Sequence, residues 1–224
     1  MKIATWNVNS LRVRLGHVLE WVALQRPDIV CLQETKIVDA DFPVEPITQA
    51  GYDVVYAGER SYNGMAILSR GAATEVVTDV AGLGDAQKRL IAATYDGIRV
   101  VNVYVPNGQE VGSEKHTYKL EWLQRLAEYV ESQLQTYSEL ALLGDFNIAP
   151  EARDVHDPVL WEGTVLFSEK ERHAFRALLD VGLIDVFRIF EQPQASFTWW
   201  DYRAGAFRRN LGLRIDHILS TQVL

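Results

Sequence analysis

Residues 90–104 read Leu-Ile-Ala-Ala-Thr-Tyr-Asp-Gly-Ile-Arg-Val-Val-Asn-Val-Tyr, two apolar runs of strand length joined by a glycine turn. The same pattern fills the middle of the chain, residues 51–104, where strand-like runs follow one another without a helical segment. A doubly wound sheet needs a helix between successive strands, so this stretch argues against that architecture. Two packed sheets flanked by helices are the better prediction.

Predicted strands and helices are interleaved along the rest of the chain. Strand-length apolar runs occupy residues 2–7, 28–33, 52–57, 65–69, 90–95, 98–104, 140–144 and 214–220. Helical spacing marks residues 11–22, residues 114–135 and a third segment that opens on the capping box Ser168-Glu-Lys-Glu171 and ends near Gly182. No repeat and no linker rich in Gly, Pro or Ser interrupts this order, so we predict one α/β domain over residues 1–224.

The composition limits the partners and the compartment. The 22 Lys and Arg residues against 30 Asp and Glu give a net charge of −8, which disfavours indiscriminate binding to nucleic acid or anionic membrane. A polyanionic partner must therefore meet a local basic patch or a metal ion. The single cysteine, Cys31, cannot form an internal disulfide, and no apolar run reaches the roughly 18 residues of a membrane span. We expect a cytoplasmic protein without a membrane partner.

Four of the strand-like segments end in or carry an oxygen-bearing side chain where another apolar one would be expected. These side chains are Asn7, Glu34, Asp145 with Asn147, and Asp216. Each alone is an ordinary turn or helix-capping residue, but ligand sites of open α/β folds gather at strand ends. In an extended chain, Asp145 and Asn147 would point to the same side. Hard oxygen ligands of this kind suit Mg²⁺ or Mn²⁺, and no Cys/His spacing suits zinc.

Six sequence blocks carry a family resemblance. They are Thr5-Trp-Asn-Val-Asn-Ser-Leu-Arg12, Leu32-Gln-Glu-Thr-Lys36, Asn102-Val-Tyr-Val-Pro-Asn-Gly108, Gly144-Asp-Phe-Asn-Ile-Ala-Pro150, Phe197-Thr-Trp-Trp-Asp-Tyr-Arg203 and Leu211-Gly-Leu-Arg-Ile-Asp216. In order and spacing, they resemble the signature blocks of the exonuclease III family of apurinic/apyrimidinic endonucleases. The resemblance implies a DNase I-like fold, a four-layer α/β sandwich of two mixed sheets. It also implies a monomeric, Mg²⁺-dependent phosphodiesterase acting on duplex DNA with abasic sites or 3′ ends.

The resemblance also assigns roles to the polar residues at the strand ends. Glu34 becomes the principal metal ligand, Asn7 holds or polarises the metal shell, and the oxygens of Asp145 and Asn147 complete the candidate metal site. Asp145 would orient or deprotonate the attacking water, or protonate the leaving group. Asn147 and Tyr104 would hydrogen-bond the phosphate, and Asp216 would lie in the outer shell of the site. Phosphodiester hydrolysis needs a cation, an activated water and donors toward the phosphate oxygens, and these residue types supply all three.

A second candidate region lies near the end of the chain, where aromatic and basic residues alternate. Its arginines are Arg203, Arg208, Arg209 and Arg214, its aromatics are Trp199, Trp200, Tyr202 and Phe207, and its one acid is Asp201. Arginines can neutralise phosphates while aromatic rings stack on an unpaired base or an empty sugar. Lys88 and Arg89 extend this patch. The structural alternative is an aromatic core strand followed by a solvated basic turn, but the resemblance places Trp199 and Trp200 in an abasic-sugar pocket.

The histidines are not candidates for catalysis. We expect His17, His116, His156 and His173 to be surface or half-buried residues. His217 follows Asp216 in a predicted strand, where consecutive side chains face opposite ways, so we expect it to point away from the site.

The end of the sequence departs from the family pattern. Family members continue with a strand and a Ser-Asp-His block, whereas this sequence stops at Leu224. We expect a truncated chain, because ending there would leave a strand edge unpaired, and we expect strongly reduced turnover if these 224 residues are the whole product. Two alternatives remain open: a DNA-binding module of the same fold with lost or weak catalysis, and another phosphoesterase of the wider superfamily.

Overall fold

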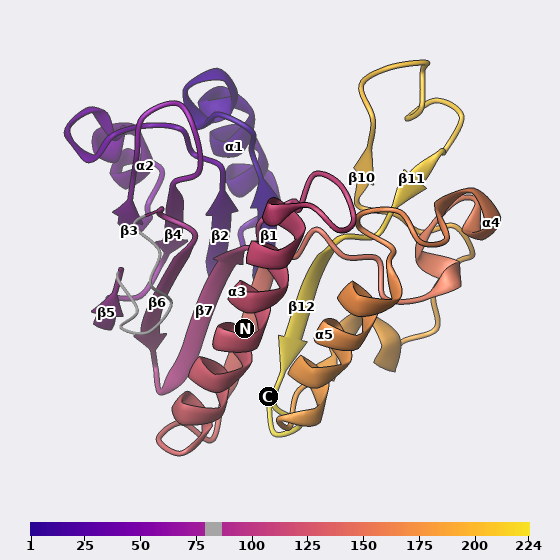
Figure 1. The fold of residues 1–224 in the computed structure, drawn as a ribbon. Helices are drawn as coiled ribbons and strands as arrows, with labels where there is room; N and C mark the ends of the chain where they lie inside the picture. The colour runs from indigo at the N-terminus through magenta and orange to yellow at the C-terminus, as the bar shows by residue number, and fades with distance from the viewer. Residues whose placement is uncertain (79–86) are drawn as a thin grey trace. The chain divides into compact units, whose positions relative to one another are not determined.

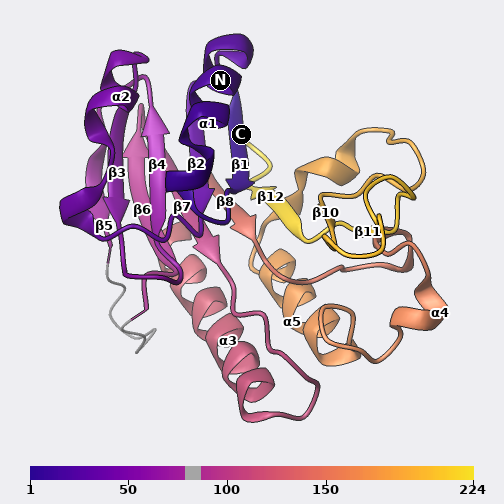
Figure 2. The same ribbon diagram turned by 90° about the horizontal axis from the view of Figure 1, so that it is seen from above.

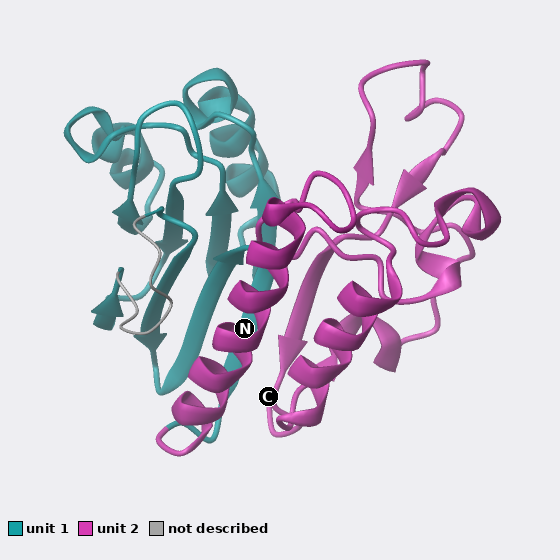
Figure 3. Cartoon of the chain, viewed as in Figure 1, with its two compact units in different colours: residues 1–104, 137–145 teal, residues 105–136, 146–224 magenta. Residues whose placement is uncertain are grey.

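The structure is a computed structural model that describes residues 1–78 and 87–224. Its described residues divide into two compact units, shown in teal and magenta in Figure 3. Unit 1 comprises residues 1–104 and 137–145, and unit 2 comprises residues 105–136 and 146–224. Each unit is assembled from separate stretches of sequence. The single domain over residues 1–224 stays a prediction from the sequence.

Unit 1 contains a first, four-stranded sheet with the order β1-β2-β4-β3 (Figure 1). Its strands are β1 (Ile3–Asn7), β2 (Ile29–Gln33), β3 (Asp53–Ala57) and β4 (Met65–Ser69), and only β1 and β2 are parallel. Helices α1 (Leu11–Gln25) and α2 (Val44–Gln49) pack against this sheet through a shared apolar cluster. Leu11, Val18 and Val22 of α1 join it, as their 3- to 4-residue spacing predicts.

The second sheet of unit 1 runs in the order β5-β6-β7-β8. Its strands are β5 (Thr74–Val77), β6 (Leu90–Tyr95), β7 (Ile98–Tyr104) and β8 (Leu140–Asp145), and β7 and β8 are parallel. The two sheets pack together, as a buried side chain of β7 shows. Asn102 donates to the carbonyls of Leu32 and Ala66 on the first sheet, 3.0 Å each, and accepts from Gln33 at 2.7 Å. These bonds satisfy an amide that would otherwise be costly to bury.

Unit 2 is built around the long helices α3 (Glu114–Leu134) and α5 (Glu169–Asp180), which lie side by side in both views (Figures 1 and 2). The predicted capping box begins α5, because Ser168 and Glu171 each accept the other's backbone N–H. Its strands form two antiparallel pairs, β9 (Ile184–Asp185) with β12 (Asp216–Ser220) and β10 (Trp199–Trp200) with β11 (Gly212–Leu213). The short helical turns are η2 (Ala152–Asp154), α4 (Pro158–Trp161) and η3 (Val186–Ile189), and η1 (Asp39–Asp41) lies in unit 1.

The fold class predicted from the sequence is confirmed: two mixed sheets are flanked by helices. All eight predicted strands form, although the last begins at Asp216 instead of residue 214, and the three predicted helices form. No helix interrupts residues 51–78 or 87–104, while residues 79–86 of the predicted all-strand stretch lie outside the described residues. The short α2 and the partly exposed β5 were not predicted, because neither carries a long periodic pattern. No helix in the described ranges is long and apolar enough to cross a bilayer.

Candidate active site

A polar cluster forms in unit 1 where three strands end. Asn7 is the last residue of β1, Glu34 directly follows β2, and Asp145 is the last residue of β8. The Asn7 Nδ2 donates to Glu34 Oε1 and to Asp145 Oδ2, with both distances 2.8 Å. Because β1 and β2 are parallel and pair Asn7 with Gln33, their ends present side chains at the same edge of the sheet. The expected gathering of Asn7, Glu34 and Asp145 is therefore present.

Asn7 acts in this arrangement as a clamp between two carboxylates. Its Nδ2 binds both, while its Oδ1 accepts from the backbone N–H of Asn9 at 3.0 Å. The backbone after Asn9 is also fixed, because the Ser10 N–H donates to the carbonyl of Glu34 at 2.7 Å. Asn9 and Glu34 have φ of 42° and 51°, a left-handed conformation that is uncommon for non-glycine residues, although Asn adopts it more readily than most.

Glu34 is held as an ionised carboxylate. Its Oε2 lies 2.8 Å from Lys36 Nζ, and the Tyr104 hydroxyl donates to the same carboxylate. Burial raises the pKa of Glu34, but hydrogen bonds from Asn7, Lys36 and Tyr104 outweigh it and leave the pKa below its usual value. Glu34 is therefore negatively charged at neutral pH, as a metal ligand must be.

Tyr104 lies beside the carboxylates as a hydrogen-bond donor. It ends β7 directly opposite Asp145 of β8. Burial, followed by the negative charges of Glu34 and Asp145, raises the pKa of Tyr104, so its phenol stays protonated. The guanidinium of Arg89 lies 4.9 Å from the centre of the Tyr104 ring and also bonds to Gln87. Arg89, predicted to bind DNA, thus lies beside Tyr104, whose backbone N–H also donates to the carbonyl of Arg89 at 2.8 Å. Lys88, predicted with it, is half-buried, and its backbone bonds to Gly64 and Glu59.

The donor set of this cluster fits a hard divalent cation. Glu34 and Asp145 supply carboxylate oxygens, and Lys36 compensates part of the negative charge of Glu34. Within residues 1–78 and 87–224, no group of three or more His, Cys, Asp or Glu side chains could hold a metal alone. A site with two protein carboxylates suits Mg²⁺, which keeps several waters and binds substrate phosphate.

Asn147 and Asp216 belong to unit 2 and are described within it. β8 ends at Asp145, and Asn147 has φ of 50°, so the predicted extended conformation across Asp145-Phe146-Asn147 is wrong. Asn147 Nδ2 donates to the carbonyl of Val105 at 3.0 Å, and its Oδ1 accepts from Asn107 at 3.2 Å. A left-handed residue breaks the two-residue alternation on which the prediction relied.

Asp216 and His217 face opposite ways on β12, as predicted. Asp216 is half-buried, and its backbone N–H bonds to Thr198 Oγ1 at 3.1 Å. His217 is buried between the rings of Phe146 and Phe175, with Nε2 2.8 Å from the carbonyl of Ile148. Burial lowers the pKa of His217, so it is a neutral core histidine.

The two tryptophans of β10 have partly structural positions. Both are half-buried. Trp199 packs against an apolar cluster that includes Leu213 and Ile215, as expected of an aromatic core strand. Trp200 Nε1 donates to Asn210 Oδ1 at 3.0 Å, and its ring meets Phe207 edge-on at 5.0 Å. Each keeps part of its surface accessible.

The arginines that follow do not form one uniform patch. Arg208 and Arg209 are exposed, while the exposed Arg203 forms an ion pair with Asp201 at 2.8 Å. Arg214 is a correction to the predicted patch, because its side chain is only 1% exposed and bonds to Asp154 and Asp185, each at 2.7 Å. Buried guanidinium groups require such carboxylate partners. Arg214 therefore stabilises unit 2 and is unavailable to a nucleic acid.

Several polar residues of the structure were missed by sequence reasoning. His116, expected at or near the surface, is 2% exposed. It shares a buried network with Lys119, Ser168 and Glu171. The sequence offered a signal for this network, because Lys119 lies on the buried face of α3 and Glu171 completes the α5 capping box. His17 and His173 are exposed and His156 is half-buried, as predicted.

Two packed mixed sheets with Glu34 and Asp145 clustered at strand ends suit a metal-dependent phosphohydrolase. The chain belongs to the Endonuclease/Exonuclease/phosphatase family, whose sequence model matches residues 4–223. This is a family of divalent-metal-dependent nucleases. The exonuclease III resemblance found in the six sequence blocks is thereby confirmed.

Relatives and solved structures agree with this assignment. The chain is 34% identical to a Bacillus subtilis exodeoxyribonuclease and to a Haemophilus influenzae exodeoxyribonuclease III, covering all of this chain and 89% of each relative. Among solved structures, it is similar to the 3′ phosphatase NExo from Neisseria bound to a product DNA hairpin, with 45% identity and a TM-score of 0.97 over 100% of this chain and 87% of that one. An AP endonuclease from Archaeoglobus fulgidus is 40% identical with a TM-score of 0.95, over 100% and 88% of the two chains.

Proposed function

We propose that this protein is a DNA-repair phosphodiesterase that incises duplex DNA 5′ of abasic sites and trims 3′ ends, using Mg²⁺ or Mn²⁺. The observation that carries the proposal is the Asn7 amide clamped between the Glu34 and Asp145 carboxylates. The exodeoxyribonuclease and AP endonuclease relatives support the substrate class.

The residues of unit 1 would bind the metal ion, hydrogen-bond the phosphate and transfer the proton. A divalent cation bound by Glu34 and Asp145 would neutralise the charge that develops on the phosphate oxygens. Asn7 keeps the two carboxylates together without neutralising either one. Tyr104, protonated because its pKa is raised, can donate a hydrogen bond to a phosphate oxygen. Asp145 moves the proton of the reaction, either from the attacking water or to the leaving group.

Residues of unit 2 would bind the DNA substrate. Asn147 donates to the phosphate, and Asp216 supports the outer shell of the site, both on the strength of the family motifs. Arg208 and Arg209 are exposed and carry the charge that an acidic protein of net −8 needs in order to hold DNA. Trp199 and Trp200 offer partly exposed rings for an abasic sugar.

The test uses an end-labelled duplex with one central abasic-site analogue. Wild-type protein is incubated with it in Mg²⁺, in Mn²⁺ and in EDTA, beside the Asp145→Asn variant as a matched control. We expect a metal-dependent nick on the 5′ side of the analogue, absent in EDTA and strongly reduced in the variant. An undamaged duplex with a recessed 3′ end measures trimming in the same conditions. Tight binding without cleavage in any metal would instead identify a DNA-binding module.

The same preparation tests two further proposals. We propose that the protein acts as a monomer, which light scattering with and without the duplex measures directly. We also propose a cytoplasmic location, with which the single buried thiol of Cys31 is compatible. Imaging of the tagged protein in its host would contradict this by showing it outside the cytoplasm.

A further inference from the structure

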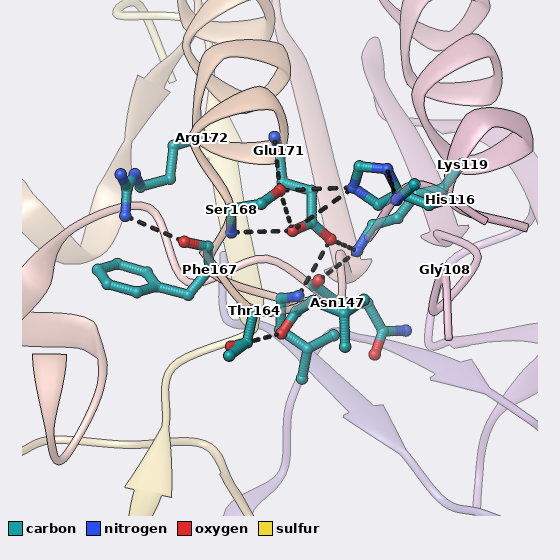
Figure 4. A network of polar contacts seen from close by, with 12 residues as sticks. Gly108, His116, Lys119, Asn147, Thr164, Phe167, Ser168, Glu171 and Arg172 are labelled. Carbon is teal, nitrogen blue, oxygen red and sulfur yellow. Dashed lines mark hydrogen bonds and ion pairs between the residues drawn. The ribbon is translucent and has the colours of Figure 1, made fainter. Parts of the chain in front are cut away.

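A buried ion pair lies in unit 2 between α3 and α5 (Figure 4). Lys119 Nζ bonds to Glu171 Oε1, and the exposed fraction of both side chains is 0%. Burying two charges carries a large desolvation penalty, and apolar residues of the same volume often stabilise a protein equally well. A purely structural core would therefore not require this pair, which directs attention to the other groups that the two side chains bind.

Lys119 binds two backbone carbonyls in addition to Glu171. Its Nζ donates to the carbonyl of Asn147 at 2.7 Å and to that of Asn107 at 3.1 Å. An ammonium group has three N–H donors, so these two bonds and the ion pair engage all of them. No apolar side chain could bind either carbonyl. Lys119 thus ties the loop that follows β7 to the loop that follows β8.

Glu171 fixes the ammonium from the opposite side. Its Oε1 also accepts from Leu166 N at 3.1 Å, and its Oε2 accepts from Ser168 N at 3.0 Å and from the Ser168 hydroxyl. Glu171 lies in the first turn of α5, where the helix dipole stabilises its negative charge. His116 Nε2 closes the network, 3.4 Å from Ser168 Oγ. Glu171 is therefore held rigidly and in turn fixes the position of Lys119.

The residue that this network holds is Asn147. Its backbone is left-handed, its carbonyl binds Lys119, and its side-chain amide bonds to Val105 and Asn107. Gly108 completes the packing: its φ is 91°, and a Cβ there would lie 3.0 Å from the Cδ of Lys119. The loop that follows β7 therefore packs closely against the stem of Lys119, and any side chain at position 108 would press on it.

We infer that the buried Lys119–Glu171 pair is a positioning device that sets the orientation of the Asn147 amide for phosphate binding. The inference rests on the proposed function, because it assigns Asn147 a role in cleavage. Lys119 and Glu171 act through Asn147 and touch no substrate. Interactions that orient functional groups in this way are commonly worth about 10–100-fold in activity. We expect the pair to influence turnover more than substrate affinity.

The test uses the charge-neutral double variant Lys119→Met/Glu171→Gln, which removes both charges together and leaves no unpaired one in the core. We expect cooperative unfolding, a kcat lowered about 10–100-fold and a KM changed less than about 3-fold. In an Asn147→Ala background, the same double substitution should lower kcat no further, because the residue it positions is already gone. A role in stability alone would instead act equally in both backgrounds.

The matched control is Arg99→Met at the far end of β7. Arg99 is also a buried basic residue, and it donates to the carbonyl of Glu75 at 2.8 Å and to Thr94 at 3.2 Å. It lies five residues before Tyr104 in an extended strand, about 17 Å away. We expect Arg99→Met to lower the melting temperature and to leave kcat unchanged.

Two outcomes overturn the inference. The first is wild-type kcat in the double variant, and the second is an equal loss of kcat with and without Asn147. If the double variant does not unfold cooperatively, Gly108→Ala, which displaces the lysine stem, is measured in the same two backgrounds and judged by the same criteria. Absence of cleavage by the wild-type protein would overturn the proposed function instead, so the two failures are distinguishable.

Discussion

The protein contains two Lys–Glu pairs in contrasting surroundings. Lys36 and Glu34 lie 2.8 Å apart at the strand ends of unit 1, with 24% and 17% of their side chains exposed. Lys119 and Glu171 pair within unit 2 with no exposed side-chain surface. The first carboxylate accepts bonds from Asn7, Lys36 and Tyr104 and keeps part of its surface exposed. Both oxygens of the Glu171 carboxylate accept bonds from groups of the protein.

This difference shows how one residue pairing serves two purposes. A carboxylate intended for a metal must remain charged and reachable, and the donors around Glu34 lower its pKa without enclosing it. A carboxylate intended to hold a loop can be enclosed fully, provided that each oxygen has a donor, as around Glu171. Solvent access therefore separates Glu34 from Glu171, although both are glutamates paired with a lysine.

The largest expected effect comes from Asp145→Asn, which tests the polar cluster at the strand ends of unit 1. The substitution removes the negative charge but keeps the shape, and the new amide oxygen can still accept from Asn7. We expect kcat for abasic-site cleavage to fall on the order of 10²–10⁴-fold while the melting temperature stays close to wild type. Single-turnover cleavage and thermal unfolding measure the two quantities. Near-normal cleavage would remove Asp145 from the reaction.

The next largest effect is on stability. Glu171→Gln and Lys36→Met each break one of the two Lys–Glu pairs, so their losses in the free energy of unfolding can be compared directly. Glu171→Gln leaves the Lys119 charge buried without its counterion, and we expect the free energy of unfolding to fall by about 3–5 kcal/mol. Lys36→Met breaks a partly exposed pair, where the loss should not exceed about 1 kcal/mol. Urea unfolding at pH 7 measures both. Equal losses would show that burial does not distinguish the two pairs.

The smallest effect is a pH dependence centred on Tyr104. Its pKa is raised in the folded protein, so above about pH 10 the unfolded chain releases a proton that the folded protein retains. The unfolded state then binds fewer protons, and the free energy of unfolding falls by about 1.4 kcal/mol per pH unit from this group. Tyr104→Phe should remove that part of the slope.

Urea unfolding between pH 9 and pH 11 tests this expectation. Tyr95, whose pKa is raised to about 12 by burial, contributes a similar fall in both proteins and therefore does not affect the comparison. Identical slopes in the wild-type protein and in Tyr104→Phe would show that Tyr104 ionises normally in the folded state.

The sequence alone determined eight of the strands, the three longest helices and the family. Apolar runs located the strands, three- to four-residue spacing located the long helices, and the Ser168–Glu171 capping box located the start of α5. These signals are local, since each depends on residues within one or two turns or within a single strand. The motifs around Asn7, Glu34 and Asp145 predicted them as site residues, although nothing local indicates that they meet.

The tertiary structure alone decided how those residues are used. Asn7 and Asp145 are 138 positions apart in the sequence, and their contact depends on two sheets packing together. Arg214 looked like a solvent-facing base until the fold placed Asp154 and Asp185 against it. Lys119 and Glu171 meet in the same way, across 52 positions. Whether a charge faces solvent, a ligand or a counterion depends on partners distant in sequence. Local sequence patterns do not predict those partners.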